Sequence, residues 1–403
     1  METYWIFFAA AVFGLVLYGF QLLAVRSSLS APRDAGEDNS LSPFSPPISI
    51  LKPLKGLDDN LLDNLLSFCA LDYPEYEIIF TLQNHNDPAY KVARKVRERN
   101  PGKDITIIVE ETPIGLNPKV NNLVAAYRAA RYEYVLISDS NVMVEEDYLK
   151  AVVSPLRDPQ VGLVSNVIRG AGGRTLGAVF ENLHLNSFIM GSVCFLDRFL
   201  KMPCVIGKSM LMRKRDLEAI GGLRAVKDIL AEDYIIGERM HKSGRRVVLS
   251  KHIINNINEY WSVQRFFNRH TRWGKLRWKI GGPKYLVELL GNPVFLSVLP
   301  LLWEQSRVTI SVALFISLVK ILGDFTLARR TGTELASPLL YMLSPVKDIL
   351  IGLLWFVPLV STTVVWRGNR YRIGRNSALF PCPETGFWSL RYRIVDVIKG
   401  RLA

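Results

Sequence analysis

Residues 48 to 139 alternate short apolar runs with segments of helical spacing, and this alternation constrains the fold more than any other feature. The runs lie near residues 48–51, 76–82, 105–109 and 134–138, and they have the length and composition of buried strands. Strands that alternate with helices over short connections form a parallel sheet with helices on both faces. We therefore expect an α/β domain over residues 48–264.

The fourth run leads directly into Asp139, Ser140 and Asn141. In open α/β sheets, ligands bind in the crevice at the carboxyl ends of the strands. An acid at that position could hold a metal ion, which in turn could hold a diphosphate. The simpler interpretation is that Asp139 caps a turn after a strand, and this stretch alone does not distinguish the two.

The N-terminus has the composition of a membrane anchor. Residues 4–25 carry no charged side chain, and about 20 apolar residues suffice to cross a bilayer. We expect a transmembrane segment at 1–28 and a linker rich in Ser, Pro, Asp and Gly at 29–47. A cleaved signal is the alternative, which the lack of a basic residue before the apolar stretch disfavours. Arg26 and the later basic residues predict that the main domain is cytosolic.

Residues 265–288 differ in character from the predicted domain before them. Basic and aromatic side chains alternate there, which suits an amphipathic helix at a membrane interface. A nucleic-acid groove has a similar composition, but the apolar segments that follow favour the interface. We expect interfacial helices here.

Membrane segments are expected again at residues 289–366, followed by a basic tail at 367–403. The apolar stretches lie near 289–302, 308–328 and 346–366. If both the α/β domain and the tail are cytosolic, the number of crossings between them is even. Because the first stretch is short for a span, we expect two full spans and one re-entrant or interfacial segment.

Charge and hydropathy narrow the class of partner. The net charge is +13, from 50 Lys and Arg against 37 Asp and Glu, which suits anionic lipids, nucleic acids or phosphorylated substrates. The hydrophobic content of 49% favours a membrane protein over a nucleic-acid binder. The four cysteines show no CxxC spacing, so neither a zinc site nor a disulfide framework is predicted.

The middle of the chain contains a glycine-rich turn and a long apolar segment. The turn at residues 170–173 lacks the strand–turn–helix spacing of a dinucleotide site. Residues 175–200 predict one long helix with an apolar face. His184 lies on this helix and could face an acceptor, although a surface or core histidine is the more ordinary interpretation.

Three acids lie where predicted strands end or helices begin. Asp87 follows the second run, Asp139 follows the fourth, and Asp233 opens a later helix. Each could serve a reaction, but each also has a structural interpretation. Asp87 before Pro88 is a typical helix cap, and an acid in a first turn, such as Asp233, is favoured by the helix dipole.

The order of these motifs resembles that of membrane-bound GT-A glycosyltransferases, and most closely the ceramide glucosyltransferase family, glycosyltransferase family 21. Asp87 and Asp139 are followed by Glu232-Asp233-Tyr234 and then by Arg269-x-x-Arg272-Trp273. Bacterial hopanoid glycosyltransferases share much of the pattern. The resembling segments span most of the chain in the family's order, and they are residues 51–56, 86–89, 117–123, 139–141, 207–214, 231–234, 269–273 and 366–372.

The resemblance implies an inverting transfer of a hexose, glucose foremost, from a UDP-sugar to the hydroxyl of a membrane lipid, ceramide foremost. It implies that Asp233 is the catalytic base. It also implies a Mn²⁺ or Mg²⁺ ion at Asp139, with Asn141 offering only a neutral carbonyl. The residues implied for UDP-sugar binding are Asp87, Lys119, Asp139, Arg269, Arg272 and Trp273.

Some of these roles have simple alternatives. Lys119 could be a solvated lysine, and Trp273 could anchor its helix at the interface. The whole chain could act on a hopanoid or with another UDP-sugar, or it could be a silent lipid-binding scaffold. A processive polysaccharide synthase is disfavoured, because Arg269 stands where that class carries Gln. The expected location is a bacterial inner membrane, or the Golgi membrane for a eukaryotic source.

Overall fold

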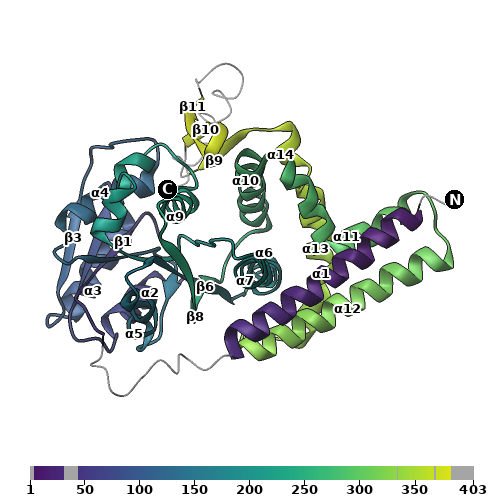
Figure 1. Cartoon of the computed structure of the whole chain (residues 1–403), viewed down its shortest axis with the longest axis horizontal. Coiled ribbons are helices and arrows are strands. Elements are labelled where there is room, and N and C mark those ends of the chain that lie inside the picture. The colour runs from purple at the N-terminus through teal and green to yellow at the C-terminus, as the bar shows by residue number, and fades with distance from the viewer. Residues whose placement is uncertain (1–3, 31–43, 334, 367–368, 383–403) are drawn as a thin grey trace, which may run out of the picture.

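The computed structural model describes residues 4–30, 44–333, 335–366 and 369–382. Figure 1 shows a sheet with its helices on one side of the molecule and a group of long apolar helices on the other. Helix α10 (Val263–Gly281) lies between the two parts.

One eight-stranded sheet forms the core of the catalytic domain, in the order β3-β2-β1-β4-β7-β6-β8-β5. Its first half is parallel, with β1 (Ile48–Pro53) between β2 (Tyr76–Leu82) and β4 (Tyr134–Ser138), and β3 (Ile105–Val109) at the edge. The other strands are β5 (Val142–Met143), β6 (Val161–Gly172), β7 (Ser209–Arg213) and β8 (Arg246–Asn258). The prediction of a mostly parallel α/β sheet is confirmed.

Helices cover both faces of this sheet because the strands are apolar on both sides. On one face lie α2 (Leu61–Cys69), α3 (Pro88–Arg99) and α5 (Tyr148–Val153). Leu65 of α2 and Val96 of α3 belong to the apolar core on this face. On the other face lie α4 (Pro118–Ala129) and α9 (Glu232–Lys242), with α8 (Lys214–Ala219) next to them.

Strand β7 breaks the parallel order in the middle of the sheet. It pairs antiparallel with β4 on one side and with β6 on the other. The residues just before β7 are thereby placed beside the end of β4, where Asp139 begins the next loop. This pairing determines which side chains meet Asp139.

The long helix expected at residues 175–200 is interrupted. It consists of α6 (Leu176–His184), a π-helical turn η2 (Leu185–Ile189) and α7 (Met190–Leu200). Single π turns inside helices occur frequently at functional sites.

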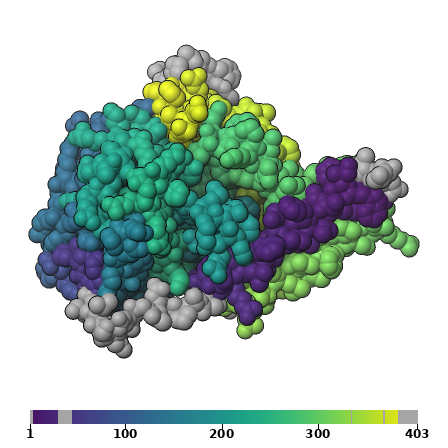
Figure 2. All heavy atoms as spheres, in the orientation of Figure 1, coloured from purple at the N-terminus to yellow at the C-terminus, as the bar shows by residue number. Residues whose placement is uncertain are grey.

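Within the described residues, three helices are long and apolar enough to cross a membrane: Tyr4–Leu29, Arg307–Thr331 and Pro338–Val360. A further candidate is a pair of segments, Val263–Gly291 and Pro293–Leu302, that meet at an angle of 67°. Figure 2 shows the N-terminal helix α1 (Tyr4–Ser30) beside α12 (Arg307–Thr331) at the end of the molecule away from the sheet. These helices indicate a membrane protein. How often the chain crosses stays a prediction.

The rest of the apolar part is built from short elements. They are η4 (Gly282–Gly291), α11 (Pro293–Val298), η5 (Leu299–Leu302), η6 (Pro338–Leu343), α13 (Ser344–Leu354) and α14 (Val357–Val360).

The end of the segment expected at 346–366 is not membrane helix, and this part of the prediction is wrong. After α14 the chain forms β9 (Thr363–Trp366), which pairs with β10 (Asn369–Ile373), and β10 pairs with β11 (Leu379–Pro381). Leu379 donates its backbone N–H to the carbonyl of Asp228 at 2.8 Å, so this small sheet is joined to the catalytic domain. A short apolar run has the same composition in a strand as at the end of a span.

Candidate active site

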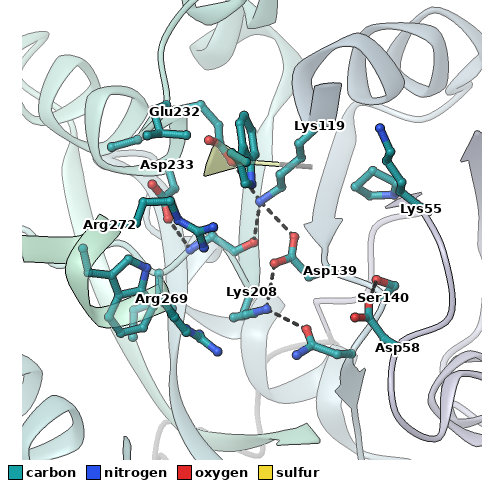
Figure 3. Close-up of a pocket in the computed structure, with 18 of the residues that line it drawn as sticks. Lys55, Asp58, Lys119, Asp139, Ser140, Lys208, Glu232, Asp233, Arg269 and Arg272 are labelled. Carbon is teal, nitrogen blue, oxygen red and sulfur yellow. Dashed lines mark hydrogen bonds and ion pairs between the residues drawn. The ribbon is translucent and has the colours of Figure 1, made fainter. Parts of the chain in front are cut away.

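A crevice of about 670 Å³ opens where β1 and β4 end, between the sheet and α10 (Figure 3). Its walls come from the loop after β1, the first turns of α4 and α9, the residues before β7 and one face of α10. Most of the predicted site residues line it together: Lys119, Asp139, Asn141, Asp233, Arg269, Arg272 and Trp273.

Lysines bind both carboxylate oxygens of Asp139. Lys119 Nζ lies 2.9 Å from Oδ1, and Lys208 Nζ lies 2.9 Å from Oδ2. Burial by itself would raise the pKa of Asp139, but the two ammonium groups outweigh burial and hold this pKa well below its usual range. Asp139 is thus a carboxylate at neutral pH, and its side chain is paired with cations from other elements.

The backbone at Asp139 is held by a buried lysine of β1. Lys52 is fully buried, and its Nζ donates to the carbonyl oxygen of Asp139 at 2.9 Å and to Ser138 Oγ at 3.3 Å. The ammonium group also lies 3.6 Å from the ring centroid of Phe68. Burial lowers the pKa of Lys52 well below its ordinary value. The end of β4 is therefore fixed before any ligand binds.

Lys119 connects the end of β4 with the start of α9. It is therefore not a solvated surface lysine. Besides Asp139, its Nζ contacts Glu232 Oε1 at 2.9 Å and donates to the carbonyl of Gly207 at 3.1 Å. Burial would lower the pKa of Lys119, but the neighbouring acids outweigh it and raise this pKa above its ordinary value. The position follows from the cap of α4, where Asn117 Oδ1 accepts from the N–H groups of Lys119 and Val120.

The ligand atoms predicted for a metal are engaged. Lys208 Nζ donates to Asn141 Oδ1 at 2.6 Å as well as contacting Asp139, and Asn141 Nδ2 donates to Asn256 Oδ1 at 2.9 Å. A divalent cation prefers several oxygen ligands and is repelled by a nearby ammonium. As they lie, these residues do not fit a divalent cation, which could bind Asp139 and Asn141 only after Lys208 had moved.

The described residues contain one cluster with the spacing of metal ligands, and it is elsewhere. The ligand atoms of Glu145, Asp147 and His252 lie within 4.8 Å of one another. None of the three lines the crevice. This cluster could hold a metal, but its position does not connect it to the residues around Asp139.

Asp233 opens onto the crevice and is held by two backbone donors. Its Oδ2 accepts from the N–H of Gly207 at 2.8 Å, and its Oδ1 accepts from the N–H of Tyr234 at 2.8 Å. The neighbouring Glu232 is buried and binds Lys119, and burial raises the pKa of Glu232. The two acids at the start of α9 therefore differ. Glu232 is structural, and Asp233 faces the space in which a substrate would lie.

One face of α10 carries the basic and aromatic part of the site. The guanidinium of Arg269 lies 4.3 Å from the ring centroid of Trp273 and forms an ion pair of 3.1 Å with the buried Glu181. Arg272 points into the crevice near Asp233 (Figure 3). Trp273 lines the crevice, so it is more than an interfacial anchor.

Asp87 is not among the described residues that line the crevice. Its Oδ1 accepts from the N–H of Ala89, so it caps α3, and both of its oxygens accept from the N–H of Gly56 at 2.9 and 3.0 Å. The neighbouring Lys55 does line the crevice. Asp87 thus reaches the site through the loop after β1, and a direct contact with the donor stays a prediction.

Three side chains that build the site were not among the predicted site residues: Lys208, Glu232 and Glu181. Lys208 and Glu232 lie inside two of the motifs that carry the resemblance, which was the available signal. Glu181 is a carboxylate within an otherwise apolar helical face, and such a residue needs a buried partner. None of these signals identifies the side chain with which Lys208, Glu232 or Glu181 pairs.

The chain is similar in sequence to two ceramide glucosyltransferases. Ceramide glucosyltransferase 1 of Caenorhabditis elegans is 28% identical over 380 residues, covering 91% of this chain and 79% of the relative. Ceramide glucosyltransferase 3 of the same organism is 28% identical over 389 residues, covering 92% and 81%.

A solved structure has a similar fold. The mannosyltransferase PcManGT from Pyrobaculum calidifontis, in complex with GDP-Man and Mn²⁺, superposes with a TM-score of 0.50 at 16% identity, covering 88% of this chain and 98% of the other. The GT-A fold expected from the sequence is thereby confirmed.

The sequence profile named Glycosyl transferase family 21 matches residues 6–379. The chain therefore belongs to glycosyl transferase family 21, and it is a glycosyltransferase that uses a sugar nucleotide.

Proposed function

We propose that this enzyme moves a hexose, glucose foremost, from a UDP-sugar to the hydroxyl of a membrane lipid, ceramide foremost, with inversion at the anomeric carbon. The observation that carries the proposal is that Asp233 and the lysine pair on Asp139 face one crevice. The crevice thereby offers a base on one side and a concentration of positive charge on the other. The ceramide glucosyltransferases of Caenorhabditis elegans support the choice of acceptor and sugar.

The transfer breaks one bond and forms one. The lipid oxygen attacks the anomeric carbon while the bond from that carbon to the diphosphate oxygen breaks, and UDP leaves with the electron pair. Asp233 accepts the proton of the attacking hydroxyl. Its two backbone hydrogen bonds fix the carboxylate in place, which favours a single productive orientation.

Negative charge develops on the departing diphosphate, and the crevice already contains cations. Lys119 and Lys208 are held beside Asp139, and Arg272 can contact two phosphate oxygens with its forked guanidinium. Preorganised charge of this kind stabilises a transition state because it needs no rearrangement during the reaction. Trp273 and Arg269 would cover the donor from α10.

The role of a metal is a separate proposal. A Mn²⁺ or Mg²⁺ ion, if bound by Asp139 and Asn141, would supply further charge for the leaving diphosphate. The present contacts of Lys208 are incompatible with that site. No part of the transfer described above depends on the ion.

We further propose that the catalytic domain lies on the cytosolic side, because basic residues follow the first apolar helix and UDP-sugars are cytosolic. A bacterial inner membrane is the proposed location, or the Golgi membrane in a eukaryote.

The function is tested with the purified full-length chain. Incubation with UDP-glucose and ceramide is expected to release UDP and to yield a lipid heavier by one hexose, measured by mass spectrometry. A hopanoid product would establish the alternative acceptor, and a polymer ladder would indicate a processive enzyme. If no lipid promotes UDP release, the proposal is wrong.

A further inference from the structure

A second, narrow cavity lies where α10 and η4 meet the apolar helices. Several elements contribute to its lining, and their polar side chains include Tyr18, His184, Arg277, Glu288, Lys320 and Asp348. Its volume is about 40 Å³, and about 10–15 Å³ is enough for one water molecule, so the cavity has room for a small polar group rather than a whole head group.

The charged side chains of this cavity are already paired. Arg277 Nε lies 2.7 Å from Glu288 Oε2, and Lys320 Nζ lies 3.8 Å from Asp348 Oδ2. Behind them, Lys347 Nζ contacts Asp348 Oδ1 at 2.6 Å. Within the described lining, each lysine or arginine therefore has an acidic partner. A phosphate would have to break one of these pairs, so the cavity suits an uncharged ligand.

Two buried polar atoms of the described lining nevertheless make no hydrogen bond, although the carboxylate oxygen among them takes part in the 3.8 Å ion pair with Lys320. They are Nδ1 of His184 and Oδ2 of Asp348, on side chains whose residues are 3% and 6% exposed. A buried polar group without a partner is unfavourable and points to a ligand that supplies one. The carboxylate oxygen requires a donor, which a hydroxyl or an amide N–H provides.

The helix beside the cavity is irregular at this point. His184 ends α6, and the π-helical turn η2 follows it directly. Phe188 of that turn stacks on the imidazole, with ring centroids 5.1 Å apart, and also lines the cavity. The stacking on Phe188 covers one face of the His184 imidazole and fixes the orientation of the ring. The direction of its Nδ1 atom is thereby fixed as well.

A buried carboxylate connects this cavity to the crevice. Glu181 Oε1 lies 3.1 Å from Arg269 Nη1, and Glu181 Oε2 lies 2.8 Å from His270 Nε2. Arg269 lines the crevice, whereas His270 lines the second cavity. The two spaces are thus separated by one ion-paired layer of α6 and α10.

We propose that the second cavity binds the acceptor lipid through one uncharged hydroxyl or amide group, which hydrogen bonds to His184 and Asp348. The lipid chains then lie against apolar side chains that α12 and α13 expose, such as Phe315 and Leu353. That the bound lipid is the acceptor rests on the proposed function. That a lipid binds in this cavity does not. Asp348 lies in the candidate span Pro338–Val360, and ionisable residues within such spans commonly mark functional sites.

The first test uses the wild-type full-length chain and a photoactivatable ceramide, with the labelled peptides identified by mass spectrometry. Label is expected on peptides of α6, η4 or α13, and unlabelled ceramide is expected to compete. Phosphatidic acid, a lipid with an anionic phosphate, is expected not to compete. Label confined to other peptides, or equal competition by phosphatidic acid, would overturn the proposal.

The second test compares variants of one side chain. His184→Phe keeps an aromatic ring but removes the nitrogen, and it is expected to raise the Kd for ceramide about tenfold, the loss of roughly one hydrogen bond. His184→Asn returns a polar atom near the position of Nδ1 and is expected to restore most of the affinity. His241→Phe, at an exposed position of α9, is the matched control. The Kd for UDP should stay constant in all three.

The outcomes separate this proposal from the proposed function. Ceramide binding at the cavity without transfer to any lipid contradicts the proposed function alone. Transfer with an unchanged Kd for ceramide in His184→Phe contradicts the cavity proposal alone. Should His184→Phe fail to fold, the peptide mapping on the wild-type chain still decides the matter.

Discussion

Asp233 and Lys119 are both anchored to the backbone of Gly207, one through its N–H and the other through its carbonyl oxygen. The N–H of Gly207 donates to Asp233 Oδ2 at 2.8 Å, while its carbonyl oxygen accepts from Lys119 Nζ at 3.1 Å. A Cβ at this position would lie 2.6 Å from Asp233 Oδ2 and 3.0 Å from Lys119 Nζ. With any residue other than glycine here, Asp233 or Lys119 would have to shift.

Gly207→Ala should consequently impair catalysis more than folding. The added methyl group pushes the carboxylate and the ammonium apart, and a misplacement of about 1 Å can cost roughly a hundredfold in rate. We expect kcat to fall by about that factor in steady-state assays. Gly102→Ala is the control, because no atom lies within 4 Å of its Cβ position. Equal activity of the two variants would contradict this account.

Asp233→Asn tests the base directly. The amide keeps the shape of the side chain but cannot accept the proton, so turnover should fall by about 10² to 10⁴. UDP binding, measured by calorimetry, should change little. Glu238→Gln, on the same helix and paired with Lys242, is the control that should retain turnover. Normal turnover of Asp233→Asn would remove Asp233 from the mechanism.

Removal of divalent metal tests whether Asp139 and Asn141 bind Lys208 or a metal ion during transfer. Because Lys208 occupies Asp139 Oδ2 and Asn141 Oδ1, we expect the wild-type enzyme to retain transfer in EDTA. Lys208→Ala removes a cation from the crevice and should lower kcat in EDTA by about a hundredfold.

Addition of Mn²⁺ should partly restore Lys208→Ala, because both oxygen atoms are then free for an ion. Lys95→Ala on the exposed face of α3 serves as the control. Complete loss of wild-type transfer in EDTA would instead support the metal predicted at Asp139 and Asn141.

The pairing of Asp139 has a defined pH dependence. Its folded pKa lies below the unfolded value of about 3.9, so the stabilisation is fully present above that value and is lost as pH falls through the folded pKa. Asp139→Asn should lower the free energy of unfolding by about 3 kcal/mol at neutral pH. Denaturation of both proteins should show a constant difference from pH 8 to 5 and a smaller one below about pH 4.

Glu181→Gln should destabilise the contact between α6 and α10. The carboxylate is fully buried between Arg269 and His270, and removing one partner of a buried ion pair costs about 3 kcal/mol. Glu98→Gln breaks the exposed pair with Arg94 and should cost less than about 1 kcal/mol. Thermal unfolding in detergent would measure both. A similar stability of the two variants would argue against a structural role for Glu181.

Local sequence alone predicted the parallel half of the sheet. β2, β3 and β4 have the bounds expected from their apolar runs, and Asn117 caps α4 as its position before Pro118 indicates. Side-chain periodicity and N-capping act over a few residues, so they can be read without a fold. The motif order also pointed to the family, because the motifs lie along most of the chain.

The tertiary structure decided which of these residues meet. β7 lies between β4 and β6, and this long-range pairing alone brings Lys208 to Asp139. The sequence pattern placed Asp87 among the residues that bind the UDP-sugar. In the structure Asp87 caps α3 and does not line the crevice.

Residues 363–366 are a second case in which local sequence did not determine the structure. They are apolar enough to end a membrane span, but they form β9 and pair with β10. Composition and spacing describe what a residue can do. Its partners depend on contacts between distant segments, which no local pattern encodes.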